Sequence, residues 1–120
     1  MGFMQSIKKT KSFKTVYSCG RQGFNAYFVI YAMANDTGVN RLGLSVSKKV
    51  GKAVVRNRVR RLIKESCRLR ATRITQGFDI VIVARPAVGA LPKEGLFRKV
   101  DKALESLFYR LRLQKSELHE

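Results

Sequence analysis

The chain has 120 residues, enough for one hydrophobic core and one domain of ordinary size. Hydrophobic residues make up 45% of it and charged residues 28%, a balance typical of a globular protein and not of a disordered one. Twenty-five lysines and arginines stand against eight acidic residues, so the net charge is +17 and the expected partner is a polyanion, most often a nucleic acid. The one histidine is His119, so a multi-histidine zinc site or a histidine-activated nucleophile is hard to build. No apolar run reaches the length of about 18 residues that predicts a transmembrane helix.

The first element expected along the chain is a helix over residues 11–19. Phe13, Val16 and Tyr17 recur there at helical spacing, and Gly20 follows as a stop signal. Residues 1–7 carry no motif, and we expect them to be disordered.

Two strands are expected next, separated by the turn-forming residues 35–38. Residues 27–33 are aromatic and β-branched, as strands prefer, and residues 42–47 alternate between apolar and small side chains. Because successive side chains of a strand point to opposite faces, one face is predicted to pack on a core and contains Phe28, Ile30, Leu44 and Val46. The other face combines rings with small groups, and its members are Tyr27, Val29, Tyr31, Met33, Gly43, Ser45 and Ser47.

The second half of the chain adds two long helices and one strand. After Gly51, residues 52–70 predict a helix, and residues 96–113 repeat apolar side chains at amphipathic helical spacing. Between them, residues 78–84 form the continuous apolar run of a strand that is covered on both sides. The order helix, strands, helix, strand, helix predicts an α+β or α/β sandwich, and we expect residues 1–120 to form a single domain.

The positive charge is concentrated between residues 41 and 73, where 12 basic residues accompany a single acidic one, Glu65. On the helix over residues 52–70, one arc is apolar and is expected to pack on the sheet: Val55, Val59, Leu62, Ile63 and Leu69. A second ridge carries cations at i, i+4 spacing, with two polar neighbours beside it: Arg56, Arg60, Lys64 and Arg68, then Asn57 and Arg61. Cations at this spacing repel one another, so the ridge favours an anionic ligand. A solvated surface helix is one alternative; a membrane-surface helix is another, but it would need the apolar face that the core uses.

Residues 42–68 form the string LGLSVSKKVGKAVVRNRVRRLIKESCR, which resembles the protein subunit of bacterial ribonuclease P. The centre of the match is Arg56-Asn57-Arg58, followed by Arg60, Arg61, Lys64 and Arg68. Upstream, Phe13-x-x-Val16-Tyr17-x-x-Gly20 and Phe28-Val29-Ile30-Tyr31 fit the opening helix and strand of that family, and residues 79–85 fit its last strand. The resemblance covers nearly the whole chain. It departs at Tyr17, where the family often has phenylalanine, and at Cys67, where the residue is usually small or apolar.

The resemblance implies a fold and a role. The fold is an α–β sandwich with a small mixed sheet, three helices and a left-handed β-α-β crossover at the basic helix, against the general rule for such connections. The role is that of an accessory subunit of an endoribonuclease that removes the 5′ leader from precursor tRNA. In that ribonucleoprotein the RNA subunit carries the hydrolytic chemistry, so no residue of this chain is expected to be catalytic and the isolated protein should be inactive.

Two sets of site residues follow from the pattern and the resemblance together. The ring-bearing sheet face and the first helix are expected to bind the leader, since unpaired bases stack on aromatic rings. These residues are Phe13, Tyr17, Val29, Tyr31, Ser45, Ser47 and Lys48. The basic helix and the turn before it are expected to contact the RNA subunit and phosphates through Lys49, Lys52, Arg56, Asn57, Arg58, Arg60, Arg61, Lys64 and Arg68.

The expected partners are the catalytic RNA subunit and precursor tRNA, with no membrane and no required protein partner. The chain itself is expected to bind no cofactor or metal, because its carboxylates are scattered, and the Mg²⁺ that the holoenzyme needs would enter through RNA. Cys19 and Cys67 are expected to be free thiols in a cytoplasmic protein. The main alternative is a non-enzymatic ribosomal or RNA-chaperone protein; a sequence-specific DNA-binding protein and a free-standing nuclease are weaker ones.

Overall fold

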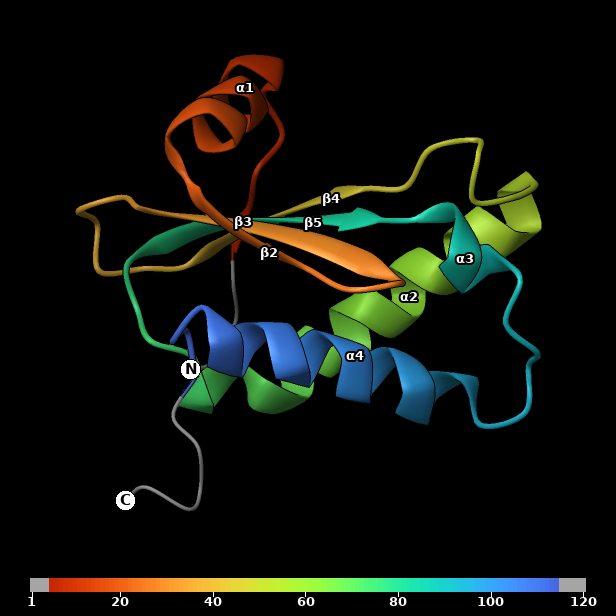
Figure 1. Ribbon diagram of the computed structural model, residues 1–120. Coiled ribbons are helices and arrows are strands. Elements are labelled where there is room, and N and C mark those ends of the chain that lie inside the picture. Colours follow the sequence, from red (N-terminus) through yellow and green to blue (C-terminus); the bar gives the residue numbers. More distant parts are fainter. Residues whose placement is uncertain (1–4, 115–120) are drawn as a thin grey trace.

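The computed structural model describes residues 5–114. Its strands are β1 (Gln5–Ser6), β2 (Arg21–Phe24), β3 (Phe28–Ala34), β4 (Arg41–Ser45) and β5 (Phe78–Ala84). Its helices are α1 (Thr10–Cys19), α2 (Ala53–Arg70), the 3₁₀ turn η1 (Ala71–Arg73), α3 (Pro86–Gly89) and α4 (Leu96–Arg110). The sheet is the middle of three layers, with α1 on one face and α2 and α4 on the other (Figure 1). The predicted α–β sandwich is confirmed.

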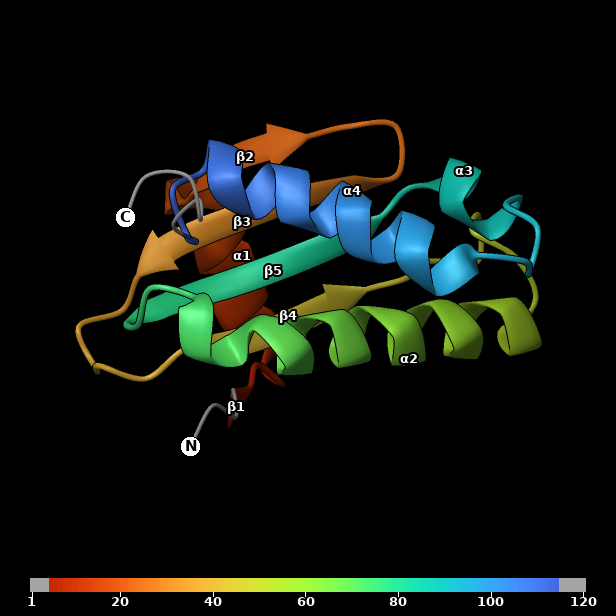
Figure 2. The ribbon, with the colours of Figure 1, turned by 90° about the horizontal axis from the view of Figure 1, so that it is seen from below.

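The five strands form one mixed sheet in the order β1-β4-β5-β3-β2. β1 and β5 run parallel to β4, whereas β3 runs antiparallel to both β5 and β2. Figure 2 views the sheet from the side of α2: β4 and β5 run from left to right, α2 returns in front of them, and β5 lies above β4. This arrangement makes the connection from β4 through α2 to β5 left-handed, as the resemblance implied.

The main core lies between the sheet and the helices α2 and α4. The inward side chains of β3 and β5, such as Phe28, Ile30 and Ile82, are fully buried there against Ile63 of α2 and Leu104 of α4. Their positions follow the predicted strand alternation and helical spacing.

A smaller core lies on the other face, beneath α1. Ile7, Val16 of α1 and Val81 of β5 are buried in it, and rings from α1 and β3 pack around them. Because β5 is buried on both faces, the prediction of a strand covered on both sides is confirmed.

The N-terminal segment differs from the expectation of disorder over residues 1–7. Gln5 and Ser6 pair with β4 as the edge strand β1, and the side chain of Ile7 is buried under α1. The expectation is therefore wrong for residues 5–7, because one apolar side chain and a few edge hydrogen bonds fix the segment. Residues 1–4 lie outside the described residues.

Three further elements were not expected. β2 (RQGF) has no strand pattern of its own and depends on pairing with β3. α3 is a single turn that starts at Pro86, a residue suited to the first helical position. The three predicted helices thus gain one short helix and the turn η1.

Two predicted side-chain positions are wrong. Tyr27 precedes the paired part of β3 and packs against the main core, because Asn25 Oδ1 accepts hydrogen bonds from the backbone N–H groups of Tyr27 and Phe28 and turns the chain there. Leu69 is exposed, because it lies roughly 90° around the helix from the buried line through Val59 and Ile63. The last helix also ends at Arg110, three residues early, and Arg112 follows in a left-handed conformation with a φ of 58°.

The buried position near the end of α2 is occupied by Arg70, which is 2% exposed. Its guanidinium donates hydrogen bonds to Asp101 Oδ1 of α4 and, at 2.8 Å, to Gln114 Oε1. The ring of Phe108 lies 5.7 Å from the guanidinium carbon. This contact set joins the end of α2 to α4 and to the residues after α4.

Both cysteines are free thiols, as predicted, but their surroundings differ. Cys19 is exposed at the end of α1, whereas Cys67 is buried in the main core. Burial raises the pKa of the Cys67 thiol to about 12.

No helix within residues 5–114 is both long and apolar enough to span a membrane.

Candidate nucleic-acid interface

The sheet face beneath α1 is organised in rows that cross the strands. In one row, Ser45 of β4, Val83 of β5 and Val29 of β3 are direct neighbours. In the next, Gly43, Val81 and Tyr31 occupy the same three strands. The register therefore brings together four residues that alternation predicted for one face: Val29, Tyr31, Gly43 and Ser45.

Helix α1 covers the second of these rows with two rings. A Cβ atom at Gly43 would lie only 2.7 Å from the ring of Phe13, so the glycine lets this ring rest on the sheet. Tyr17 stands edge-on to Tyr31 with 4.9 Å between the ring centroids, and the centroids of Phe13 and Tyr17 are 6.3 Å apart. The structure thus joins the three predicted rings in one chain of contacts.

The first row is left partly uncovered. Figure 1 shows α1 above one end of the sheet, while the end at which β4 and β5 finish extends beyond it. Ser45, Val29, Val83 and Tyr31 are half-buried, and Tyr17 is 39% exposed. We call this surface the open face and define it by Phe13, Tyr17, Val29, Tyr31, Ser45 and Val83. Val83 was not among the predicted site residues, although the alternation of its strand could have placed it here.

The remaining predicted leader residues lie beside the open face and not on it. Ser47 and Lys48 are exposed in the turn that follows β4 and leads to α2. The turn is closed by backbone hydrogen bonds from Val50 N–H to the Ser47 carbonyl and from Gly51 N–H to the Lys48 carbonyl, at 3.0 and 3.2 Å. The turn connects the open face to the basic helix.

The solvent side of α2 carries the predicted cations, and we call it the basic face: Arg56, Asn57, Arg60, Arg61, Lys64 and Arg68. Arg60 donates hydrogen bonds to Asn57 Oδ1 at 3.3 Å and to the backbone carbonyl of Val46 at 3.4 Å. The second bond directs this guanidinium toward the end of β4, where the open face ends. The first turn of α2 contains no acidic residue, although a helix N-terminus favours negative charge.

Arg56, at the start of the basic face, has an unusual environment. Its Nε atom is buried and has no hydrogen-bond partner among the described residues. A buried donor without an acceptor costs stability.

One acidic residue, Glu65, forms an ion pair with the last cation of the basic face, Arg68. Both oxygens of Glu65 accept hydrogen bonds from Arg68, at 2.9 and 2.7 Å, and these bonds lower the pKa of the Glu65 carboxyl. Arg68 is therefore less available to a phosphate than the other cations are.

Arg58 lies on a different side of α2 from Arg56 and Arg60. It lies two residues from both Arg56 and Arg60, a rotation of about 200° on a helix. There it borders a shallow hollow with Arg61, Leu62 and Glu65. The remaining predicted cations, Lys49 and Lys52, are exposed in the turn and at the residue that precedes α2.

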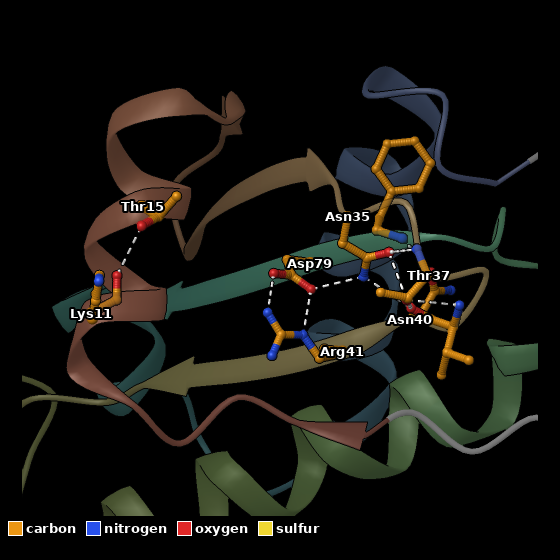
Figure 3. A network of polar contacts seen from close by, with 9 residues as sticks. Lys11, Thr15, Asn35, Thr37, Asn40, Arg41 and Asp79 are labelled. Carbon is orange, nitrogen blue, oxygen red and sulfur yellow. Dashed lines mark hydrogen bonds and ion pairs between the residues drawn. The ribbon is translucent and has the colours of Figure 1, made fainter.

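The opposite end of the sheet holds a polar network in which Asp79 and Arg41 form an ion pair (Figure 3). Asp79 of β5 is buried and accepts hydrogen bonds from Arg41 Nε at 2.7 Å and from Asn35 Nδ2 at 2.8 Å. These bonds, above all those from Arg41, hold the pKa of the Asp79 carboxyl below its usual range. The ion pair therefore joins β4 to β5 and stabilises the fold.

Within residues 5–114, no three histidine, cysteine, aspartate or glutamate side chains lie together as the ligands of a metal ion would.

Comparisons with known proteins show which proteins this chain resembles. The family model described as Ribonuclease P matches residues 1–108. The ribonuclease P protein component of Caldanaerobacter subterraneus is 44% identical over 98% of this chain and 93% of its own length, and that of Clostridioides difficile is 45% identical over 88% and 90%. The solved structure of the Staphylococcus aureus RNase P protein superposes with a TM-score of 0.81 at 30% identity, covering 94% of this chain and all of that one. The protein from Thermotoga maritima gives a TM-score of 0.77 at 30% identity, with 88% and 96% covered.

Proposed function

Because this chain belongs to the ribonuclease P protein family, we propose that its open face binds the 5′ leader of precursor tRNA while its basic face contacts the RNA subunit. Membership of the family makes it a subunit of the ribonuclease P holoenzyme, an endoribonuclease that processes the 5′ ends of tRNA, in association with the RNA subunit. This outweighs the alternative of a ribosomal or RNA-chaperone protein.

The observation that carries the proposal is that the two surfaces meet at the turn after β4. The open face ends at Ser45, and Arg60 of α2 reaches the carbonyl of the next residue, Val46. An RNA strand that leaves the open face therefore passes directly onto cations. Unpaired bases can stack on the rings of Tyr17 and Tyr31 while the phosphates face Lys48 and Arg60.

This arrangement suits substrates whose leaders differ in sequence. Stacking on a ring requires only the π-face that every base has, and phosphates are the same in every nucleotide. The half-buried hydroxyl of Ser45 adds a donor and an acceptor beside the rings. Recognition by shape and charge is the expected result.

The chemical step is assigned to the RNA subunit and its divalent ions, with Mg²⁺ entering through RNA. What this chain contributes is position: rings hold the leader and cations offset the repulsion between two RNA molecules. We place this work in the cytoplasm, where tRNA precursors are made.

The test is cleavage of a precursor tRNA by a bacterial ribonuclease P RNA at low Mg²⁺ concentration. RNA with this protein should cleave at the mature 5′ end faster than RNA alone, and protein alone should not cleave. Tyr17→Ala should weaken binding of a precursor with a long leader about tenfold, whereas Tyr17→Phe keeps the ring and should bind like the unmodified protein. Equal behaviour of both variants would contradict leader binding on the open face.

A further inference from the structure

The surface next to the open face carries an exposed ring that is not among the predicted site residues. Phe24, at the end of β2, is 56% exposed and is paired in register with Val29 of the open face. Its neighbour Gly23 faces the other way, toward Leu111, so alternation turns Phe24 to the same side of the sheet as α1. The row Ser45-Val83-Val29 thus continues to Phe24 at the sheet edge.

A cation lies beside this ring. The guanidinium carbon of Arg85, the residue after β5, is 6.0 Å from the centre of the Phe24 ring, and its Nη1 donates a 3.0 Å hydrogen bond to the backbone carbonyl of Asn25. Among the ion pairs of the described residues, none involves Arg85. Its charge is therefore available to a phosphate while the carbonyl fixes its position.

The backbone beneath the ring is firmly held. Arg110 of α4 donates a 2.8 Å hydrogen bond to the Phe24 carbonyl, and Asn25 Nδ2 donates one of 2.9 Å to the carbonyl of Ala103. A ring on a fixed support loses little further freedom when a base stacks on it.

Phe24 is close enough to the predicted ring of Tyr31 for both rings to belong to one binding surface. Tyr31 is two residues from Val29, the direct partner of Phe24, so the two residues are diagonal neighbours on adjacent strands, a spacing of about 7–8 Å that aromatic side chains can bridge. Bases of neighbouring nucleotides in one strand can reach both.

Building on the proposed function, we propose that Phe24 and Arg85 form an additional binding position for an unpaired nucleotide of the precursor leader, with its base on the ring and its phosphate at the guanidinium. A single exposed apolar side chain needs no explanation by itself. This one combines a ring, a cation and direct continuity with a row of half-buried apolar residues, which are the components of a single-strand binding surface.

The experiment uses holoenzyme reconstituted with the RNA subunit and a series of precursors whose leaders are lengthened one nucleotide at a time. With unmodified protein, affinity should rise in steps as successive nucleotides reach the protein. Phe24→Ala should remove the gain in affinity that comes from one of the later leader nucleotides. Affinity for long-leader precursors should then fall about five- to tenfold, and affinity for short-leader precursors should not change. Phe24→Tyr should restore the step, and Arg85→Gln should weaken it and reduce its salt dependence.

Matched controls separate this inference from the proposed function. Val39→Ala truncates another exposed apolar residue, in the turn at the opposite end of the sheet, and should change nothing. If Tyr17→Ala weakens long-leader binding and Phe24→Ala does not, the additional position is wrong and leader binding on the open face stands. If neither variant depends on leader length, the proposed function fails as well. Equal weakening of all precursors by Phe24→Ala would show a general effect and would also overturn the inference.

Discussion

The two ends of α2 use arginine in opposite ways. Near the C-terminal end, Arg70 is buried, and its guanidinium is shared between Asp101, Gln114 and the ring of Phe108. Near the N-terminal end, Arg56 and Arg60 have no carboxylate partner among the ion pairs of the described residues. One helix therefore carries arginine that stabilises the fold and arginine that is available to RNA.

The difference shows that basic composition alone does not locate a nucleic-acid interface. The pairs Arg70–Asp101 and Arg41–Asp79 use two of the few acidic residues inside the structure. The remaining cations on α2 then have almost no internal partners, and an external polyanion is left to neutralise them. Substitution of a paired arginine should therefore reduce stability, whereas substitution of an unpaired arginine should reduce RNA binding.

The largest effect is expected for Arg70→Ala. This substitution removes the cation that pairs with Asp101 and Gln114. The free energy of unfolding should therefore fall by about 3–5 kcal/mol in denaturant titrations. Arg61→Ala, an exposed arginine on the same helix, is the matched control and should change that free energy by no more than about 0.5 kcal/mol. Similar losses for both variants would break the comparison.

A smaller effect is expected for Asp79→Asn, and it should depend on pH. Because Arg41 and Asn35 lower the pKa of Asp79 in the folded protein, the carboxylate stabilises the fold above its unfolded pKa of about 3.9, and this contribution is lost as the pH falls through the lower folded value. At pH 7 the variant should be less stable by about 1–2 kcal/mol, since Arg41 is partly exposed.

The difference between Asp79→Asn and the unmodified protein should shrink below about pH 4 in unfolding titrations. Asp36→Asn, in the exposed turn nearby, is the matched control for the loss of one carboxylate, and it should change the free energy of unfolding at pH 7 by no more than about 0.5 kcal/mol. A difference that stays constant down to pH 2 would contradict a structural ion pair.

Arg60 represents the arginines of α2 that have no carboxylate partner. Arg60→Ala should weaken RNA binding and change the free energy of unfolding by no more than about 0.5 kcal/mol. Each phosphate contact that is lost should reduce the slope of log affinity against log salt by about 0.7 for single-stranded RNA. The measurement is holoenzyme affinity for precursor tRNA at several salt concentrations, with Arg60→Lys as the control that keeps the charge. An unchanged slope for Arg60→Ala would remove it from the interface.

The smallest effect is expected for Glu65→Gln. It frees Arg68 from its bidentate partner on an exposed surface, so the salt slope should become steeper by up to about 0.7 if Arg68 gains a phosphate contact. The melting temperature should not change measurably. Weaker RNA binding by this variant would show that Glu65 itself contacts the partner.

The sequence predicted the elements whose patterns arise from burial. The alternation in residues 27–33 and 78–84 and the helical spacing in α2 and α4 follow directly from one side facing a core. β1, β2 and α3 were missed because two to four residues hold too little pattern, and their conformation depends on pairing or on a neighbouring turn. Arg70 was not expected inside, since a buried arginine is understood only with its partners, which come from α4 and beyond.

The candidate site was predictable to a similar degree. Alternation and helical spacing identified Tyr31, Ser45 and the basic face, and the resemblance added Phe13 and Tyr17. Phe24 could not be found in this way, because its side depends on the register between β2 and β3, and the sequence of β2 gives no strand signal. The rotation of about 200° between Arg58 and its neighbours Arg56 and Arg60 follows from helical geometry alone, so it could have been predicted from the sequence.

The contrast between the two thiols makes the protein a single-site substrate for labelling chemistry. Thiol reagents attack the thiolate, and a buried group whose pKa is raised to about 12 is almost entirely protonated and shielded at neutral pH. Cys19 is exposed on α1, two residues after Tyr17. One fluorophore added to the unmodified chain therefore marks the border of the open face, without mutagenesis and without disturbing the core.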